Sequence, residues 1–419
     1  MSDFATGRFG PARIRLVALL TAHTSAQTGN TITVLATPFF VLSQGGSALN
    51  VGLASTFATV PIIIGGPMGA VLVDRLGQRL SSIIADVASA ATVLAIAVLS
   101  YHGLLPFWGF LLLIFASGLL DTPGQTARTV LMPDVSAEAG APLARTVGFA
   151  TGAERAATLV GAPLGGFLVS LLGASAAFAV TGVFFVISSL LVLTLVRTPH
   201  SRSRIGAAIA ETPSYWRDLA DGFRFVVQQP LLRLIVVMVF MTNLLDAGRF
   251  SVLLPLRSEA WPEGASAVGL ISGALGAGAL AGSLLFGFIG HRVRRRPLFV
   301  VAFLIAGGPL SLAFASSIPL PALLVVSVVT GLASGTLNPI IGTLRLELAP
   351  QAMRARAQSL MIAGSWAGIP IGSLLAGASV GWIGVQASFL VIGAIYMIVA
   401  MLPISGGAWK GMDQDPRRR

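Results

Sequence analysis

Several ionisable side chains interrupt long apolar stretches of the sequence, and five of them are candidates for proton coupling. They are Asp121, Glu154, Arg155, Asp246 and Arg249. An ionisable group held away from water is costly unless it is paired, so such groups are by default candidates for binding or for proton transfer. Arg249 follows Asp246 by three residues, which places both on one helical face. The spacing therefore favours mutual neutralisation, a structural role, over proton transfer for this pair.

The other three groups lie in two consecutive apolar stretches, at 105–131 and 143–171. If these stretches form antiparallel helices, Asp121 lies level with Glu154 and Arg155, and an ion pair or a shared proton between them is geometrically reasonable. Two acids that share one arginine leave one carboxyl without a full counter-charge, as a proton carrier requires. The candidate carrier is Asp121 or Glu154, and a static ion-pair network is the alternative.

The composition indicates what must position these groups. Hydrophobic residues make up 55% of the 419 and charged residues 10%, with a mean hydropathy of +0.85. Soluble domains carry roughly a quarter charged residues, so a water-soluble fold is excluded. The absence of cysteine excludes disulfides, thiol nucleophiles and thiolate metal sites. No small-residue cleavage site follows a short apolar region, so we expect the first apolar stretch to remain as a spanning helix.

Windows of about 20 apolar residues predict a chain that crosses the membrane twelve times. The odd-to-even connections contain no Lys or Arg, whereas the other connections and both chain ends are rich in arginine. By the positive-inside rule, both termini and the long middle connection face the cytoplasm. This orientation accounts for the net charge of +11 and argues against nucleic-acid binding. The predicted spans lie near 13–42, 50–73, 80–101, 105–131, 143–171, 174–197, 231–257, 267–290, 297–316, 319–345, 355–379 and 384–404.

The middle connection divides the chain into two halves. Within it, Trp216, Leu219, Phe223 and Val226 recur at helical spacing, which predicts an amphipathic helix that lies on the membrane surface as a tether. The predicted organisation is a six-helix bundle at 1–197, a linker at 198–230, a second six-helix bundle at 231–404 and a cytoplasmic tail at 405–419.

The two halves are similar to each other at an offset of 217 residues. Several matches at one unbroken offset indicate a duplicated bundle, and parallel repeats of this kind are related by an axis along the membrane normal. The matches pair Pro38 with Pro255, "VGL" at 51–53 with "VGL" at 268–270, Gly65 with Gly282, and Arg128 with Arg345.

The stretch "AVLVDRLGQR" at 70–79 is similar to the G-x-L-x-D-R-x-G-R-[KR] loop of major facilitator superfamily proteins. "GAPLGG" at 161–166 resembles the antiporter motif late in helix five of that family, and "RTVLMPDV" resembles its macrolide-efflux and enterobactin-exporter branch. The resemblance implies an all-α membrane fold of two pseudo-symmetric six-helix bundles with the site between them. It assigns the helix-five motif to Gly161, Pro163, Gly165 and Gly166.

The loop at 70–79 also predicts a conformational latch. By pseudo-symmetry, Asp74 approaches the start of the eleventh helix, whose partial positive charge favours a carboxylate by ~0.3–1 kcal/mol. Gly77 permits the tight turn. A basic loop that serves orientation alone is the alternative. We expect the two arginines of this loop, Arg75 and Arg79, to bridge to Asp86 or Asp134.

The resemblance further implies that the first, fourth, seventh and tenth helices line a central cavity. Polar side chains near the middle of these helices are candidates for substrate contacts, although such side chains also join helices by hydrogen bonds. A histidine here could titrate near neutral pH or be a hydrogen-bonded core residue. The candidates are His23, Gln27, Asn30, Thr31, Asn243, Ser334 and Asn338, with Trp366 of the eleventh helix either facing the cavity or packed.

The leading functional hypothesis is a secondary transporter that exports small amphipathic or hydrophobic molecules by alternating access, with proton antiport. An importer or uniporter of a small metabolite uses the same fold and is the nearest alternative. A non-transporting membrane receptor is the alternative from another class. No HExxH, GxSxG or P-loop string is present, which argues against an enzyme and against ATP-driven transport. We expect no cofactor or metal, and a monomer in the cell membrane.

Overall fold

The computed structural model describes residues 10–196, 223–290, 292–348 and 354–413. Every regular element within these ranges is a helix, and none of them is a strand. The predicted tether lies mostly outside the described residues, because Trp216 and Leu219 fall in the gap before residue 223. The end of the predicted cytoplasmic tail, from residue 414 on, also lies outside them.

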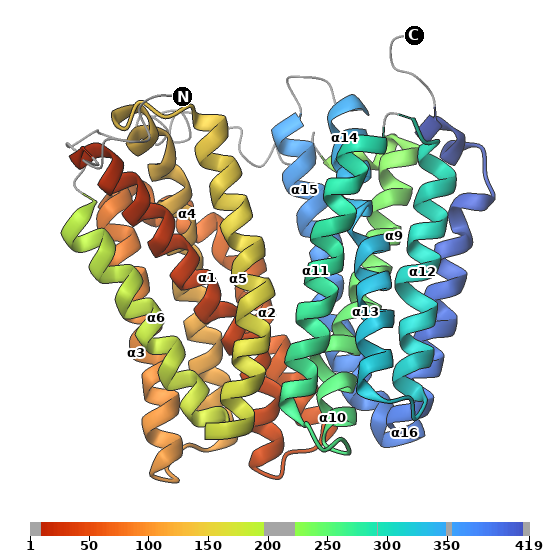
Figure 1. Ribbon diagram of the computed structural model, residues 1–419, viewed down its shortest axis with the longest axis horizontal. Helices are drawn as coiled ribbons and strands as arrows, with labels where there is room; N and C mark the ends of the chain where they lie inside the picture. Colours follow the sequence, from red (N-terminus) through yellow and green to blue (C-terminus); the bar gives the residue numbers. More distant parts are fainter. Residues whose placement is uncertain (1–9, 197–222, 291, 349–353, 414–419) are drawn as a thin grey trace. The chain divides into compact units, whose positions relative to one another are not determined.

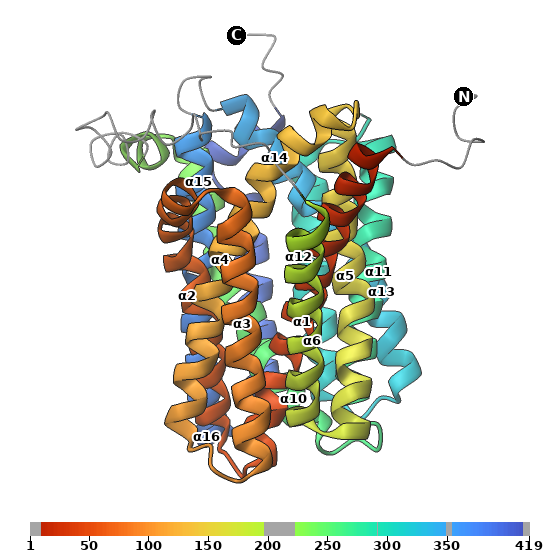
Figure 2. The same ribbon diagram turned by 90° about the vertical axis from the view of Figure 1, so that its left-hand side faces the viewer.

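The first six predicted spans correspond to six long helices, α1 to α6. Their ends agree with the predicted ends to within a few residues, except that α4 continues past 131 to Glu138. Figure 2 shows α3 and α4 side by side along much of their length, and these two helices are packed against each other. The bounds are Pro11–Ser43 for α1, Ala48–Leu76 for α2, Gln78–Tyr101 for α3, Phe107–Glu138 for α4, Leu143–Leu172 for α5 and Ala174–Leu195 for α6.

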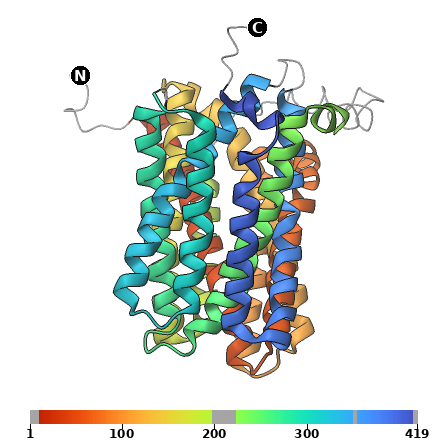
Figure 3. The ribbon, with the colours of Figure 1, turned by 90° about the vertical axis from the view of Figure 1, so that its right-hand side faces the viewer.

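The helices of the second half are more interrupted. Figure 1 shows α11, α12 and α13 upright beside one another, and Figure 3 shows α16, which packs against both α12 and α9. The seventh span comprises α9 (Pro230–Ala247), the π-helix η1 (Gly248–Leu253) and α10 (Leu254–Ser258). The remaining bounds are Ala265–Ile289 for α11, Arg295–Ala315 for α12, Leu320–Gly335 for α13, Leu337–Leu348 for α14, Arg354–Trp366 for α15, Gly368–Met401 for α16, Leu402–Ile404 for η3 and Ala408–Asp413 for η4.

Two glycines permit sharp turns between spans. Gly77 has φ 81° and ψ 154°, and it ends α2 and caps α3, which confirms the predicted turn. Gly384 has φ 77° and ψ 169° and bends α16 between the predicted eleventh and twelfth spans. Residues with a Cβ avoid this region of φ and ψ, so both turns require glycine.

Ten stretches within the described residues are long and apolar enough to cross a membrane. One of them, Leu360–Ile404, covers 45 residues and contains the turn at Gly384, so it holds two of the predicted spans. The 33-residue helix α1 is not among the ten, because polar side chains such as His23, Gln27 and Asn30 lower its hydropathy. The predicted twelve spans are therefore accounted for by ten stretches, one internal turn and α1.

The chain groups into two compact units, each with its own packed core. In the first unit, Leu19 of α1, Leu131 and Val135 of α4 and Val192 of α6 form a buried apolar cluster. In the second, a larger cluster joins α9, α12 and α16 to the short helix η4. The first unit comprises Met1–Thr33, Val60–Gly161 and Ser175–Glu211, and the second comprises Val34–Thr59, Ala162–Ala174 and Thr212–Arg419. The division into bundles at 1–197 and 231–404 follows topology and stays a prediction.

Candidate functional site: buried charges within the first unit

Asp86 of α3 and Arg128 of α4 form a fully buried ion pair. Arg128 Nη1 donates a hydrogen bond of 2.6 Å to Asp86 Oδ1, and both side chains are 0% exposed. Ser188 of α6 donates to the other carboxylate oxygen, Oδ2, at 2.6 Å. The two helices come close at Gly124, where a Cβ atom would lie 3.0 Å from the Cβ of Ala85. The pair and its serine therefore tie three helices together away from water.

Asp121 continues this chain of charges on α4. Its Oδ1 lies 3.7 Å from Arg128 Nη2, and neither of these buried atoms has a hydrogen-bond partner. Its Oδ2 accepts hydrogen bonds from Asn30 Nδ2 of α1 at 2.7 Å and from Gln125 Nε2 at 2.6 Å. Asp121 is 4% exposed. Two buried acids thus share one arginine, and the network carries one negative charge in excess when both acids are ionised.

A second pair, His23 and Glu154, joins α1 to α5. His23 Nε2 lies 2.8 Å from Glu154 Oε1. The imidazole is 2% exposed and its Nδ1 has no hydrogen-bond partner, whereas the Glu154 side chain is 45% exposed. One partner of this pair is thus buried and the other is open to its surroundings, which is an arrangement that can hand a proton from outside to a buried group.

The predicted pairing through Arg155 differs from the observed one. Arg155 is exposed, whereas the acids bond to other partners, Asp121 to Asn30, Gln125 and Arg128, and Glu154 to His23. Adjacent residues on an α-helix point about 100° apart. Glu154 and Arg155 therefore cannot face the same neighbour.

The arginines of the loop at 70–79 also differ from their predicted contacts. Arg79 Nη2 donates to the carbonyl oxygen of Leu193 on α6 at 2.5 Å, and Arg75 is exposed. The predicted partner Asp86 is bonded to Arg128 and Ser188 instead. The side chain of Asp74 is not among those that the structure describes, so the latch stays a prediction.

Asp246 and Arg249 form the predicted pair within the second unit. Arg249 Nη2 donates to Asp246 Oδ1 at 2.5 Å, and Tyr396 Oη donates to Asp246 Oδ2 at 3.5 Å. Arg249 Nη1 also bonds to the carbonyl oxygen of Gly307 at 2.9 Å and to Ser311 Oγ at 3.2 Å on α12. Its guanidinium lies 5.5 Å from the centre of the Tyr396 ring. The arginine is fixed by several partners at once, which supports a structural role.

Arg249 lies in the π-helix η1, an element that the hydropathy pattern does not predict. A π-helical turn contains one more residue than an α-helical turn and is frequent at functional sites. Here the turn lies where Gly248 packs against the carbonyl oxygen of Gly372 on α16, 3.0 Å from where a Cβ would be. The irregular turn thus lies at a close contact between two helices.

The residues predicted to line a central cavity contact different partners. Asn30 contacts Asp121 and also lies 3.4 Å from Gln27 Oε1, whereas Thr31 bonds to the backbone of its own helix. Asn243 Nδ2 donates to the carbonyl oxygen of Ser365 on α15 at 2.9 Å. Ser334 bonds to the carbonyl oxygen of Gly331 in its own helix, and Asn338 and Trp366 are exposed. Asn30 and His23 are the candidates that the structure brings to acidic groups.

The helix-five motif forms close helix contacts. Within the second unit, a Cβ on Gly166 of α5 would lie 2.5 Å from the carbonyl oxygen of Ala265 and 3.0 Å from the Cα of Gly269 on α11. A Cβ on Gly269 would in turn lie 3.0 Å from the Cα of Pro163. The helices therefore cross at backbone contact. Gly165 is buried, and in the first unit Gly161 packs against Thr31 of α1.

Three residues of this site, Arg128, Gln125 and Ser188, were not predicted, and Asp86 was predicted only as a partner of the loop arginines. One signal was available for Arg128. It follows Asp121 by seven residues, which is two helical turns and the same face, and an arginine side chain is long enough to reach back toward an acid at that spacing. Within the described residues, no group of three or more His, Asp or Glu side chains could hold a metal ion.

Comparison with known proteins agrees with this architecture. The family model of the Major Facilitator Superfamily matches residues 19–260 and 250–406. The chain is 28% identical to the multidrug efflux pump Tap of Mycolicibacterium fortuitum, over 94% of this chain and 95% of the relative. It is 24% identical to macrolide efflux protein A of Streptococcus pyogenes, over 87% and 89% of the two chains.

Solved structures agree in fold. A crystal structure of the nucleoside transporter NupG superposes with a TM-score of 0.69 at 16% identity, covering 96% of this chain and 99% of the other. A crystal structure of a D-xylose–proton symporter gives 0.67 at 18% identity, covering 97% and 98%. The predicted all-α fold of two six-helix bundles is thereby confirmed. The chain belongs to the Major Facilitator Superfamily and is a multi-pass membrane transporter.

Proposed function

We propose that this transporter exports small amphipathic or hydrophobic molecules by alternating access, driven by protons that move inward. The observation that carries the proposal is the buried chain Asp86–Arg128–Asp121, in which two acids share one arginine. The efflux relatives Tap and macrolide efflux protein A support the direction and the class of substrate. No P-loop is present in the sequence, so an ion gradient is the energy source that we propose.

Asp121 is the proton carrier in this proposal. When Asp121 is ionised, the network of Asp86, Arg128 and Asp121 has a net charge of −1, and when Asp121 is protonated the net charge is 0. Asp86 is fully bonded to Arg128 and Ser188, whereas Asp121 Oδ1 has no hydrogen-bond partner, so Oδ1 is the atom that accepts the proton. Protonation weakens the attraction between Asp121 and Arg128 and leaves Arg128 paired with Asp86.

The change of charge on Asp121 reaches α1 directly. Asn30 of α1 donates to Asp121, and a neutral carboxyl accepts a weaker hydrogen bond than a carboxylate does. Loading and release of the proton therefore change how firmly α1 is held to α4. Glu154 and His23 are the proposed entry for protons, because Glu154 is half exposed and bonded to the buried His23.

Transport in proteoliposomes tests this function. We would impose a pH gradient and follow a macrolide and the fluorescent cation ethidium. The proposal expects proton-driven movement of at least one of them out of the compartment of higher pH, lost in Asp121→Asn and in Glu154→Gln. Glu138→Gln is the matched control, since Glu138 is an exposed acid paired with Arg15. Transport of the compounds that does not depend on the pH gradient, or that persists in Asp121→Asn, would overturn the proposal.

We also propose that the chain lies in the cell membrane as a monomer with both termini in the cytoplasm. The arginine-rich connections support this orientation. Two arginines at helix ends on the proposed cytoplasmic side form ion pairs with nearby acids. Arg15 bonds to Glu138 at 2.8 Å, and Arg295 bonds to Glu347 at 2.6 Å. Labelling of single cysteines introduced into the connections, from either side of the membrane, tests the orientation.

A further inference from the structure

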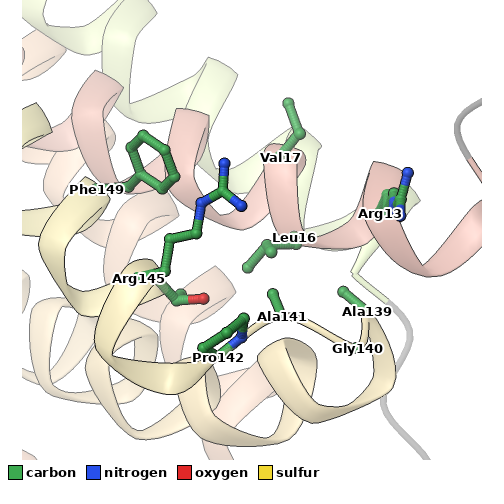
Figure 4. A pocket seen from close by; sticks show the side chains of 10 residues that line it. Arg13, Leu16, Val17, Ala139, Gly140, Ala141, Pro142, Arg145 and Phe149 are labelled. Atoms are coloured by element: carbon green, nitrogen blue, oxygen red, sulfur yellow. The ribbon is translucent and has the colours of Figure 1, made fainter. Parts of the chain in front are cut away.

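A pocket lies within the first unit at the start of α1 and α5, and none of the buried acids lines it (Figure 4). Its volume is about 250 Å³. Drug-sized sites occupy roughly 300–1,000 Å³, so this pocket has room for a small group or for one end of a larger ligand. Its lining comes from three segments, Arg13, Leu16 and Val17 of α1, the connection Ala139–Pro142, and Arg145, Thr146 and Phe149 of α5.

The rim of this pocket is basic. Arg13 and Arg145 are both exposed, and the Arg145 guanidinium lies 5.6 Å from the centre of the Phe149 ring. Glu138, an acid close to the pocket in the chain, bonds to Arg15 at 2.8 Å and therefore does not neutralise the two rim arginines. The first turn of α5 adds the partial positive charge of a helix N-terminus. The rim is therefore complementary to an anion.

The rest of the lining is apolar and open. Phe149 is 57% exposed and Val17 is 55% exposed, and Leu16 and Pro142 extend this surface. Figure 4 shows the Arg145 side chain between Phe149 and the α1 residues Leu16 and Val17. A small soluble anion would leave this apolar surface in water. The combination of two arginines with an exposed apolar face favours a ligand that carries an anionic head and an apolar chain.

We propose that this pocket binds one anionic phospholipid, with its phosphate between Arg13 and Arg145 and the start of its acyl chain along Val17 and Phe149. The lipid belongs to the cytoplasmic leaflet, where the proposed orientation puts the starts of α1 and α5. This site is separate from the proposed proton carrier. A bound lipid would hold together one end each of α1, α4 and α5. Farther along, the same three helices carry Asn30, Asp121 and Glu154.

Lipid binding to the purified full chain tests the proposal. Native mass spectrometry would measure the retention of phosphatidylglycerol and, separately, of phosphatidylcholine. Each arginine near an anionic lipid contributes about 1 kcal/mol, or roughly 5-fold in affinity. We therefore expect the double variant Arg13→Gln, Arg145→Gln to bind phosphatidylglycerol roughly 30-fold more weakly, with binding of phosphatidylcholine unchanged.

The matched control removes two other exposed arginines, Arg224 and Arg294, by substitution with glutamine. It keeps the same net charge as the pocket variant and should retain phosphatidylglycerol like the unmodified chain. Glycerol 3-phosphate at millimolar concentration should not displace the lipid, because it has no acyl chain. Equal loss of lipid in both double variants would show general surface attraction and overturn the proposal. Displacement by glycerol 3-phosphate would do the same, because it would assign the pocket to a soluble phosphate.

Discussion

The buried ion pair between Asp86 and Arg128 should contribute to the free energy of unfolding, which can be measured independently of transport. Arg128→Gln removes the only cation bonded to Asp86 in the described network and leaves Asp86 and Asp121 as two buried acids without a counter-charge. Breaking a buried pair by removing one partner costs about 3–5 kcal/mol. Both side chains are 0% exposed, so water cannot screen the remaining charge, and we expect a loss in this range.

A second substitution should restore part of that loss. Asp86→Asn removes one of the two stranded charges, and the amide can still accept the hydrogen bond from Ser188. Residues in one network couple by about 0.5–3 kcal/mol, and a direct pair 2.6 Å apart should lie near the upper end. The double variant Asp86→Asn, Arg128→Gln should therefore be about 2 kcal/mol more stable than the sum of the single losses predicts.

Denaturant unfolding in detergent micelles, followed by circular dichroism, measures these free energies. Arg155→Gln is the control, because it makes the same chemical change at an exposed arginine on α5 and should cost less than about 0.5 kcal/mol. Equal stability of Arg128→Gln and Arg155→Gln would contradict a buried ion pair at Arg128. Losses of the two single variants that simply added in the double variant would contradict the direct contact of Arg128 with Asp86.

Three further substitutions probe the helix contacts, the latch and a turn. Gly166→Val should destabilise the chain or stop transport, because its Cβ would lie 2.5 Å from a backbone oxygen, whereas Gly152→Val has open space and should be tolerated in the same expression and transport assays. Asp74→Asn should raise the labelling of cysteines introduced on the cytoplasmic side, and Glu263→Gln, at an exposed acid outside the predicted latch, should leave it unchanged. Gly384→Ala should lower the unfolding free energy by about 1–3 kcal/mol, because its φ of 77° suits only glycine.

The helices could be predicted from the sequence because membrane spans depend on length and hydropathy, which are local properties. The tenth predicted span at 319–345 covers both α13 and α14. The break between α13 and α14 near Thr336 does not interrupt the apolar stretch. The π-helix that follows Ala247 does not interrupt its apolar stretch either. Such irregularities follow from contacts between helices, so a hydropathy window cannot detect them. The turn at Gly77 was predictable because glycine in a short basic loop is a local signal.

The sequence indicated which helices carry buried ionisable residues, but not which of these residues contact each other. The predicted pair of Asp246 with Arg249 is confirmed, whereas the predicted sharing of Arg155 by Asp121 and Glu154 is wrong. The sequence did not identify Arg128 as the partner of Asp121 and Asp86, because the contacts of Asp86 and Ser188 depend on how α3 and α6 pack against α4. The bond of His23 to Glu154 connects residues 131 positions apart, and no spacing in the chain indicates it.

In the proposed function, protons carried by Asp121 move in the direction opposite to the substrate. Proteoliposomes loaded with ethidium or a macrolide, with equal pH on both sides and a pH-sensitive dye inside, test it most directly. Efflux of the compound should draw protons inward and acidify the lumen, and Asp121→Asn should abolish the pH change while Glu138→Gln keeps it. A lumen that becomes alkaline or does not change during efflux, or that acidifies equally with Asp121→Asn, would contradict the claim.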